Sequence, residues 1–145
     1  LQVSPNDVQE VLIETKGAIE KLLTDNGFGN FQIKSRTKTV KVLSEEMQQG
    51  KKLEEIHDYL AIRIILSDDD SEQCFKTVEL IHQNYHYLPE RFKDYINKPK
   101  DDGYQCLHTT IIDENGMEYE IQVRTAAMDK KAQTGYQKYK GNKPN

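Results

Sequence analysis

The sequence predicts an α/β domain of the α+β type, in which helices pack on a mostly antiparallel or mixed β-sheet. Three observations favour this fold class. Apolar residues recur at helical spacing near the N-terminus, a continuous apolar run follows, and two alternating runs enclose an Asn-Gly pair in the second half. With 145 residues, 36% of them hydrophobic, the chain can form one proper core. We expect residues 1–145 to form one domain. This expectation is compatible with the sequence being a segment of a longer chain.

A helix is expected first, over residues 6–26, because apolar side chains recur there every three or four positions and Gly27 follows as a stop. Residues 31–38 are then expected to be extended. A second, shorter helix is predicted from about Thr39 to Gly50. Its inward-facing residues would be Val40, Leu43 and Met47.

The most apolar run, residues 58–66, is expected to be a buried strand. Alternation places on one of its faces Ile62, Ile64 and Leu66. The acidic turn at 68–70 predicts the start of a helix, because carboxylates favour the positive N-terminal end of the helix dipole. That helix should run to about Tyr85. Its packed residues would be Phe75, Val78 and Ile81.

Residues 86–103 contain two prolines among charged residues and are expected to be irregular. Two strands should follow, roughly over 104–112 and 117–124. The connection at 113–116 contains the Asn-Gly pair, which is a strong hairpin signal between alternating runs. A helix over 126–139 is expected near the C-terminus.

The predicted hairpin would have an apolar face against the helices and a polar face that either meets solvent or lines a site. The apolar positions of its second strand are Met117, Tyr119, Ile121 and Val123. The polar positions are Glu118, Glu120, Gln122 and Arg124. In the first strand, the residues that point the same way as each other are Tyr104, Cys106, His108 and Thr110. From alternation alone, solvated surface is the simpler interpretation.

The loop before the hairpin favours a site, because it gathers cations and aromatic rings within a short stretch. Lysines bind phosphates as point charges, and a flat aromatic ring offers a stacking platform for a base. The residues concerned are Arg91, Phe92, Lys93, Tyr95, Lys98, Lys100 and Tyr104. A solvated, charged loop is the alternative interpretation.

The overall composition excludes some classes of function. A formal net charge of −4 argues against a general nucleic-acid binder, so we expect no DNA partner. No apolar run approaches the length of a membrane span, so we expect no membrane partner. Two cysteines, Cys74 and Cys106, lie far apart with no metal-like spacing, which favours a reducing, cytoplasmic setting.

Three patterns suggest metal binding. Asp58 opens the apolar strand, where a carboxylate is a natural Mg²⁺ ligand, although it can equally act as a cap. The pair His57-Asp58 is also similar to the metal signature of phosphohydrolases, which needs further histidines and aspartates. His82 and His86 are four residues apart and could bind a metal from one helix face. Helix-end histidines that interact with the dipole are the favoured interpretation of that pair.

Several segments together resemble the synthetase domain of the RelA/SpoT family of guanosine tetra- and pentaphosphate synthetases. The resemblance runs from about residue 31 to 135, and its specificity comes from the order and spacing of several motifs at once. The motifs are Arg36-Thr37-Lys38, Glu55 to Arg63, Arg91 to Ile96, Pro99-Lys100, Gly103 to Thr110, and Glu120 to Thr125 with Met128.

The resemblance implies a nucleotidyltransferase-like mixed sheet flanked by helices. It implies an enzyme that moves the β,γ-pyrophosphate of ATP to the 3′-hydroxyl of GDP or GTP, releases AMP and uses Mg²⁺. The product would be the alarmone of the stringent response. Such a protein takes ATP and GDP or GTP as partners, and a homo-oligomer is compatible with this role.

The resemblance also implies roles for individual residues. Asp58 and Glu120 would be the catalytic carboxylates and the metal ligands, and Glu120 would position the metal or take the proton of the attacking hydroxyl. The residues for ATP would be Arg36, Lys38 and Arg63. Tyr104 would stack on guanine. The other residues for the guanine nucleotide would be Lys93, Lys100, His108 and Gln122.

The chain departs from the family pattern at several positions. Glu46 stands in place of a lysine and would repel ATP phosphates, and Asp102 stands in place of an asparagine and adds negative charge near the guanine. Cys106 replaces a serine, and residues 135–139 replace an alanine–histidine–tryptophan stretch. A catalytically weak or degenerate nucleotide-binding or regulatory domain is therefore the alternative hypothesis.

Overall fold

The computed structural model describes the backbone of residues 5–41 and 56–142, and within them the side chains of residues 8–37 and 60–134. The helices separate groups of strands along the chain, and the longer strands lie in both halves. In chain order the elements are α1 (Pro5–Asp25), β1 (Phe31–Lys41), β2 (Ile56–Leu66), α3 (Ser71–Asn84), β3 (His86–Tyr87), the 3₁₀ turn η2 (Pro89–Arg91), β4 (Lys93–Asp94), β5 (Leu107–Ile112), β6 (Glu118–Thr125) and α4 (Ala126–Asn142).

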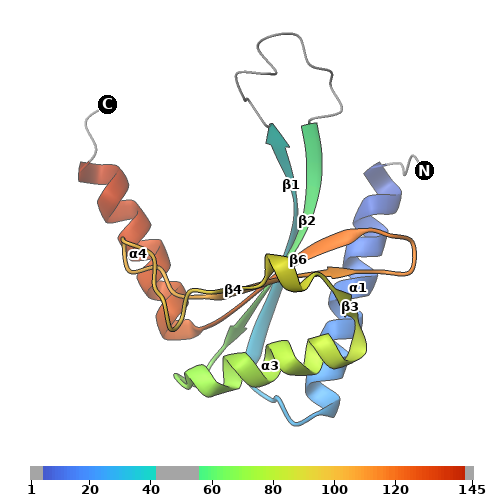
Figure 1. Ribbon diagram of the computed structural model, residues 1–145, viewed down its shortest axis with the longest axis horizontal. Coiled ribbons are helices and arrows are strands. Elements are labelled where there is room, and N and C mark those ends of the chain that lie inside the picture. The colour runs from blue at the N-terminus through green and yellow to red at the C-terminus, as the bar shows by residue number, and fades with distance from the viewer. Residues whose placement is uncertain (1–4, 42–55, 143–145) are drawn as a thin grey trace.

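The strands of the described residues form one mixed sheet in the order β1-β2-β6-β5-β3, and β4 also pairs with β5. The central pair, β2 and β6, is parallel. All other pairs are antiparallel. In Figure 1, β1 and β2 extend together away from the other strands toward the top. The predicted fold class, a mixed sheet flanked by helices, is confirmed.

One face of the sheet is covered by α1 and α3, which Figure 1 shows at the right and the bottom. Apolar side chains from both helices meet those of β2, β5 and β6 in a single core. The fully buried members with the largest side chains include Tyr119, Leu12, Ile19, Leu23, Ile62, Ile64, Ile81, Ile111 and Ile121. The predicted apolar face of the hairpin therefore does face the helices. We call the opposite face of the sheet the open face.

The connection from β2 into α3 follows the sequence prediction. The side chain of Asp70 accepts a hydrogen bond from the backbone N–H of Glu72 at 3.0 Å, which satisfies a donor in the first turn of the helix. The helix ends with Tyr85 as its C-terminal cap. Within it, Val78 and Ile81 are buried, while Phe75 packs partly buried against the core.

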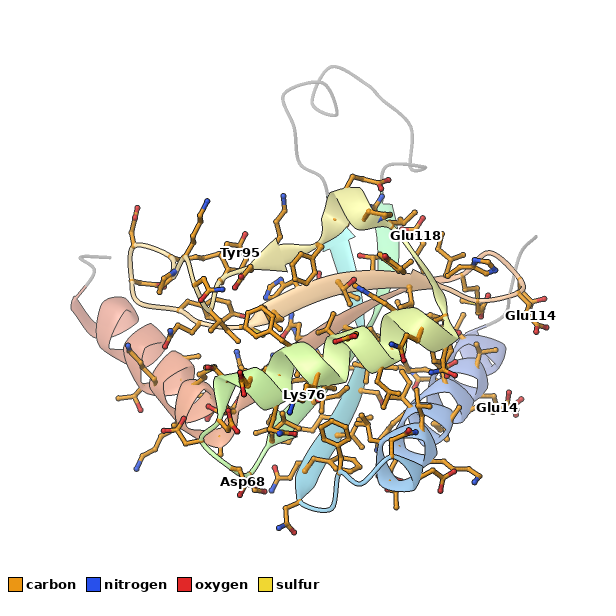
Figure 2. All side chains as sticks on the ribbon, turned by 60° about the horizontal axis from the view of Figure 1, so that its bottom comes forward. Glu14, Asp68, Lys76, Tyr95, Glu114 and Glu118 are labelled. Atoms are coloured by element: carbon orange, nitrogen blue, oxygen red, sulfur yellow. The ribbon has the colours of Figure 1, made fainter. Side chains whose placement is uncertain are left out.

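The hairpin between β5 and β6 turns through residues 113–117, and Figure 2 shows Glu114 at its tip. The Asp113 carboxylate accepts hydrogen bonds from the N–H groups of Asn115 and Met117 at 2.8 and 2.9 Å. Gly116 has φ +82, whereas no described non-glycine residue has positive φ. The turn therefore differs from a two-residue Asn-Gly turn, in which both central residues would have positive φ.

Three predictions about secondary structure differ from what the structure shows. The helix expected from Thr39 does not begin there, because β1 continues to Lys41 and pairs with β2 as far as Ile56. Two β-branched residues, Thr39 and Val40, favour this extended backbone over a helix. The rest of that predicted helix, including Leu43, Met47, Glu46 and Gly50, lies outside the described residues.

The segment expected to be irregular, residues 86–103, contains β3, η2 and β4. Each is too short to show a period in the sequence, and β3 and β4 exist because they pair with β5. The strand predicted from residue 104 begins only at Leu107. Before it, Lys100 N–H bonds the carbonyl of Tyr104 at 3.1 Å, so this stretch closes a loop instead of pairing in the ladder.

Candidate functional site

A single row of polar side chains crosses the open face of the sheet. Antiparallel pairing sets Lys34 of β1 opposite Arg63 of β2, and parallel pairing sets Arg63 beside Gln122 of β6. Gln122 pairs with His108 of β5, which in turn pairs with Lys93 of β4. Because paired residues in neighbouring strands point to the same face, these side chains form one continuous row.

The next row contains Glu120, between Ala61 of β2 and Thr110 of β5, with Arg36 of β1 paired to Ala61. Hydrogen bonds connect the two rows. Arg63 Nε donates to Gln122 Oε1 at 3.2 Å, and Gln122 Nε2 donates to Glu120 Oε1 at 2.6 Å. The Gln122 amide therefore fixes the carboxylate of Glu120 relative to the guanidinium of Arg63.

Two pockets open on either side of Arg63 and Gln122. The first, which we call the Tyr104 pocket, has a volume of about 280 Å³ and is lined by Arg63, Asp102, Tyr104, Gln122, Arg124, Lys131, Ala132 and Gln133. The second, which we call the Glu120 pocket, has a volume of about 290 Å³ and is lined by Lys34, Ser35, Arg36, Ala61, Ile62, Arg63, Glu120 and Gln122. Both have Arg63 and Gln122 in their walls, so they adjoin.

The ring of Tyr104 is held by several neighbours at once. Its hydroxyl lies 2.8 Å from His108 Nε2. The Tyr95 ring meets it edge-on with centroids 6.1 Å apart, and Lys100 Nζ lies 5.4 Å from its centroid. On the backbone, Asp102 Oδ1 accepts from Tyr104 N–H at 2.9 Å. Tyr104 is half-buried, so the ring is fixed and still open to the pocket.

Gly103 allows the loop that carries Tyr104 to turn close to α4. Its φ is +86, a conformation that side chains on L-residues disfavour. A Cβ atom there would lie 3.4 Å from Lys131 Cε, which belongs to the wall of the Tyr104 pocket. Another residue at this position would therefore strain the turn through its positive φ, while its Cβ would make ordinary van der Waals contact with the lysine.

Arg124 forms the buried floor of the Tyr104 pocket. Its relative exposure is 3%, and both Nε and one terminal nitrogen donate to Asp129 Oδ1, at 3.0 and 2.6 Å. Gln133 Nε2 donates to the other carboxylate oxygen of Asp129 at 3.0 Å. The guanidinium carbon of Arg124 lies 5.7 Å from the centre of the Tyr104 ring, within the range of cation–π attraction. Helix α4 is thus connected to the aromatic ring through this arginine.

The environment favours the neutral forms of three titratable groups at this pocket, Tyr104, Cys106 and His108. Burial raises the pKa of the Tyr104 hydroxyl and of the Cys106 thiol. Burial also lowers the pKa of His108, and the nearby Lys100, Arg124 and Arg63 charges lower it further, although the Glu120 carboxylate acts in the opposite direction. A neutral imidazole can accept the hydrogen bond that the Tyr104 hydroxyl donates.

The structure brings together most of the site residues that the sequence pointed to. The side chains that share the open face and its two pockets are Arg36, Arg63, Tyr104, Glu120 and Gln122, with His108 in the same row. Lys100 lies over Tyr95 and Tyr104, at 4.8 and 5.4 Å from the ring centres. Lys93 is exposed at the end of the row and lines neither pocket.

The side chains of Asp58, Lys38 and His57 lie outside the described residues. The backbone places Asp58 in β2, paired with Thr39 and two residues before Leu60, where the parallel ladder with β6 begins. Convergence of Asp58 and Glu120 on one metal ion therefore stays a prediction, as do the ATP contact of Lys38 and the phosphohydrolase pattern at His57-Asp58.

Sequence reasoning missed some residues that line the pockets. Lys34 and Lys131 had been given no role, and Arg124 had only been placed on a polar face. The alternation of Lys34 with Arg36 along an extended segment is a signal that could have identified Lys34, because both positions share one strand face. No comparable local signal marks Arg124 as buried.

The open face offers a carboxylate that can coordinate a magnesium ion together with substrate phosphates. Among residues 8–37 and 60–134, no three His, Cys, Asp or Glu side chains lie close enough to form a metal cage. Magnesium usually takes one or two protein carboxylates together with substrate phosphates and water. Glu120, set in a pocket wall beside Arg36 and Arg63, is suited to be one such ligand.

His82 and His86 do not form a metal pair on a helix. His86 lies in β3, beyond the end of α3. His82 is in the last turn, but its ring stacks on Tyr87 with centroids 3.6 Å apart, and its Nε2 lies 2.7 Å from Thr109 Oγ1. Burial lowers the pKa of His82, which disfavours the charged form that the predicted dipole interaction would use.

No helix in the described part of the chain is both long and apolar enough to cross a membrane. The two cysteines are free thiols, and both are buried.

Comparison with known proteins gives consistent matches. A family model described as a region found in RelA / SpoT proteins matches residues 35–143. A guanosine-3′,5′-bis(diphosphate) 3′-pyrophosphohydrolase of Spiroplasma citri is 39% identical over 134 residues, covering 91% of this chain and 18% of that protein. A probable chloroplastic GTP diphosphokinase of Oryza sativa subsp. japonica is 34% identical over 131 residues, covering 88% of this chain and 18% of that protein.

The fold is shared with a solved structure as well. Small alarmone synthetase 2 from Bacillus subtilis superposes with a TM-score of 0.65 at 28% sequence identity, over 92% of this chain and 78% of that chain. The curated relatives are much longer, since the chain spans only 18% of each of the two described above.

Proposed function

This chain belongs to the RelA/SpoT family, and we propose that it transfers the β,γ-pyrophosphate of ATP to the 3′-hydroxyl of GDP or GTP, making the alarmone of the stringent response. The observation that carries the proposal is the pair of adjoining pockets that share Arg63 and Gln122. One pocket offers an aromatic ring, and the other offers cations and a carboxylate. A donor and an acceptor nucleotide can therefore lie side by side, with their reacting atoms at the shared wall.

In this proposal the Tyr104 pocket holds the guanine nucleotide. The half-buried ring of Tyr104 provides a flat surface for the base, and base–aromatic stacking is worth about 1–3 kcal/mol. Lys100 and His108, beside the ring, lie where they can contact the ribose and phosphates. Lys93, at the end of the same row, is placed to meet a phosphate that extends beyond the pocket.

The Glu120 pocket holds the triphosphate of ATP. Arg36 and Arg63 reach it from β1 and β2 and neutralise the phosphate charges, with Lys38 expected to assist. Arginine suits this task because its guanidinium can make two parallel hydrogen bonds to phosphate oxygens. Ala61, between Arg36 and Glu120, is small and leaves the floor of the pocket open.

The reaction needs alignment, charge neutralisation and one proton acceptor. The 3′-oxygen of the guanine nucleotide forms a bond to the β-phosphorus of ATP, and the bond from that phosphorus to the oxygen bridging to the α-phosphate breaks, so that AMP leaves. Glu120 accepts the proton of the 3′-hydroxyl. Gln122 keeps the carboxylate oriented through its 2.6 Å hydrogen bond.

Glu120, together with Asp58, would hold Mg²⁺. When bound, the ion neutralises phosphate charge and polarises the phosphoryl oxygens. Arg63 is hydrogen-bonded to Gln122 and lines both pockets. Its guanidinium can therefore contact the pyrophosphate both before and after transfer.

The names of the relatives support guanosine-3′-pyrophosphate chemistry, although they describe longer proteins. One is named for forming such compounds and another for hydrolysing them. Transfer is favoured over hydrolysis for this chain because the match covers the segment with the two pockets, which provides room for two nucleotides. We also propose a reducing, cytoplasmic setting, which free buried thiols favour.

The test is a turnover assay with ATP, GDP or GTP, and Mg²⁺, measuring AMP and the guanine product. We expect both products in equal amounts. Glu120→Gln should lower the rate by about 10²-fold or more, while calorimetry shows both nucleotides still bound. If no AMP forms under any condition although both nucleotides bind, the degenerate nucleotide-binding domain replaces the proposal. A Glu120→Gln variant with the wild-type rate would remove Glu120 from its role.

A further inference from the structure

Lys34 lies in the Glu120 pocket at a position where its charge is unfavourable in the empty protein. It pairs directly with Arg63 across β1 and β2, on the same face of the sheet. Like charges at directly opposite positions of an antiparallel pair destabilise the sheet. Arg36, two residues further along β1, adds a third cation to the same pocket wall.

Among the described residues of the pocket wall, little negative charge balances these cations. Glu120 is the one carboxylate among the described residues of its wall, and its Oε1 accepts a hydrogen bond from Gln122. Within the part of the chain that the structure describes, neither Lys34 nor Arg63 forms an ion pair. The described side chains of the pocket wall therefore carry an excess of positive charge, in a protein whose formal net charge is −4.

An arrangement of this kind is suited to a polyanion. Lys34, Arg63 and Gln122 lie in one row, so a chain of phosphates along that row can contact the lysine at one end and reach the wall shared with the Tyr104 pocket at the other. A triphosphate bound this way relieves the repulsion between Lys34 and Arg63, because its oxygens lie between the two cations.

We propose that Lys34 is a further phosphate-binding residue, which contacts the polyphosphate of the donor nucleotide together with Arg63. The inference rests on the proposed function for the identity of the donor. The role assigned to Lys34 depends on its positive charge and on its position opposite Arg63. Lys34 touches the ligand and does not act on the proton of the attacking hydroxyl, which is the task of Glu120.

Opposite effects on stability and on binding distinguish this role from that of an ordinary surface lysine. Lys34→Gln removes the repulsion, so the empty protein should unfold at the same or a slightly higher denaturant concentration. The same change should lower the affinity for ATP and for inorganic tripolyphosphate by about fivefold at low salt, and by less at high salt. Lys34→Arg, which keeps the charge, should restore most of the affinity.

Lys76→Gln is the matched control, because Lys76 is also an exposed lysine but lies on α3, where it lines a separate hollow with residues 26–28 of the turn that follows α1. Figure 2 shows Lys76 on α3 and Tyr95 in the loop before β5, with strands of the sheet between them in that view. The control should leave tripolyphosphate affinity unchanged. Affinity for GDP, which binds the other pocket, should change little in Lys34→Gln.

Calorimetric titration with tripolyphosphate and ATP, next to the turnover assay, separates the two proposals. If the wild-type protein turns over but Lys34→Gln binds tripolyphosphate as tightly as Lys76→Gln does, Lys34 is not a phosphate ligand and the proposed function stands. If the wild-type protein makes no AMP but Lys34→Gln still loses tripolyphosphate affinity relative to Lys76→Gln, the phosphate contact stands and the proposed reaction fails.

Discussion

The two pockets on the open face are built in contrasting ways. In the Tyr104 pocket two central side chains are fixed in advance, since Arg124 is 3% exposed and bonded to Asp129, and Tyr104 is held by its hydroxyl and its backbone. In the Glu120 pocket, Lys34 and Arg36 are exposed. Stacking on a base is short-ranged and needs a surface already in place, whereas Coulomb attraction to phosphate acts over longer distances and tolerates mobile cations.

The two pockets also differ in when their side chains lose conformational entropy. A fixed aromatic ring loses little side-chain entropy when a base stacks on it, so the ordering cost is met during folding. Exposed lysine and arginine side chains lose that entropy when the phosphate arrives. Variants of the first pocket should therefore affect stability as well as binding, and variants of the second should affect mainly binding.

The largest effect is expected from Asp129→Asn, which leaves the buried guanidinium of Arg124 without a countercharge. Removing one partner of a buried ion pair destabilises a protein strongly, and we expect a loss of about 3 kcal/mol in the free energy of unfolding. Guanine-nucleotide affinity should fall too, because Arg124 supports the Tyr104 ring. Urea unfolding monitored by circular dichroism measures the first effect, and titration with GDP measures the second.

The control is Asp25→Asn, which removes a pair of similar length on the surface. Lys21 and Asp25 are 2.8 Å apart, with side chains 76% and 57% exposed. Exposed pairs contribute little to stability, so this variant should unfold close to the wild type. Equal urea midpoints for Asp129→Asn and Asp25→Asn would contradict the view that the Tyr104 pocket is fixed by its buried charge pair.

A smaller effect, on binding, is expected from Tyr104→Ala. Loss of the stacking surface should lower the affinity for GDP by about tenfold or more. The affinity for ATP should fall much less, because ATP is assigned to the other pocket. Separate calorimetric titrations of the two nucleotides measure the ratio. Tyr87→Ala is the control, since Tyr87 is an exposed tyrosine that stacks on His82 away from both pockets. If Tyr104→Ala weakens both nucleotides equally, the two pockets are not separate sites.

The smallest effect concerns the dependence of stability on pH. The pKa of His108 is lowered in the folded protein, so below about pH 6.5 the unfolded chain binds a proton that the folded protein resists. Stability should therefore fall as the pH drops from about 7 to 5. His108→Asn should reduce that slope in urea unfolding carried out at a series of pH values. Identical slopes for the two proteins would mean that folding does not lower the pKa of His108.

The contrast between the pockets also explains which site residues could be predicted from the sequence. Glu120, Gln122 and His108 were placed on one face by alternation along two strands, and this holds because the period of a strand is fixed by its backbone. Tyr104 was picked out by the composition of its loop and by family resemblance. These are local signals, each contained within a few residues.

The burial of Arg124 could not be predicted, because it depends on a helix that begins two residues later and folds Asp129 back over the strand. Likewise, the role of Lys34 depends on the register that sets it opposite Arg63. The predicted helix at Thr39 was wrong because its apolar spacing fitted a helix locally, whereas pairing with β2 offers this segment a full ladder of backbone hydrogen bonds.

The sequence by itself determined the principal helices, the central strands and the family resemblance, because hydrophobic periodicity, capping residues and motif spacing are properties of neighbouring residues. Tertiary structure alone decided which side chains share a pocket. Lys34, Arg63, Gln122, His108 and Lys93 come from five different strands, and only the register of the sheet places them in one row. A shift of one residue in any strand would turn its side chain to the opposite face.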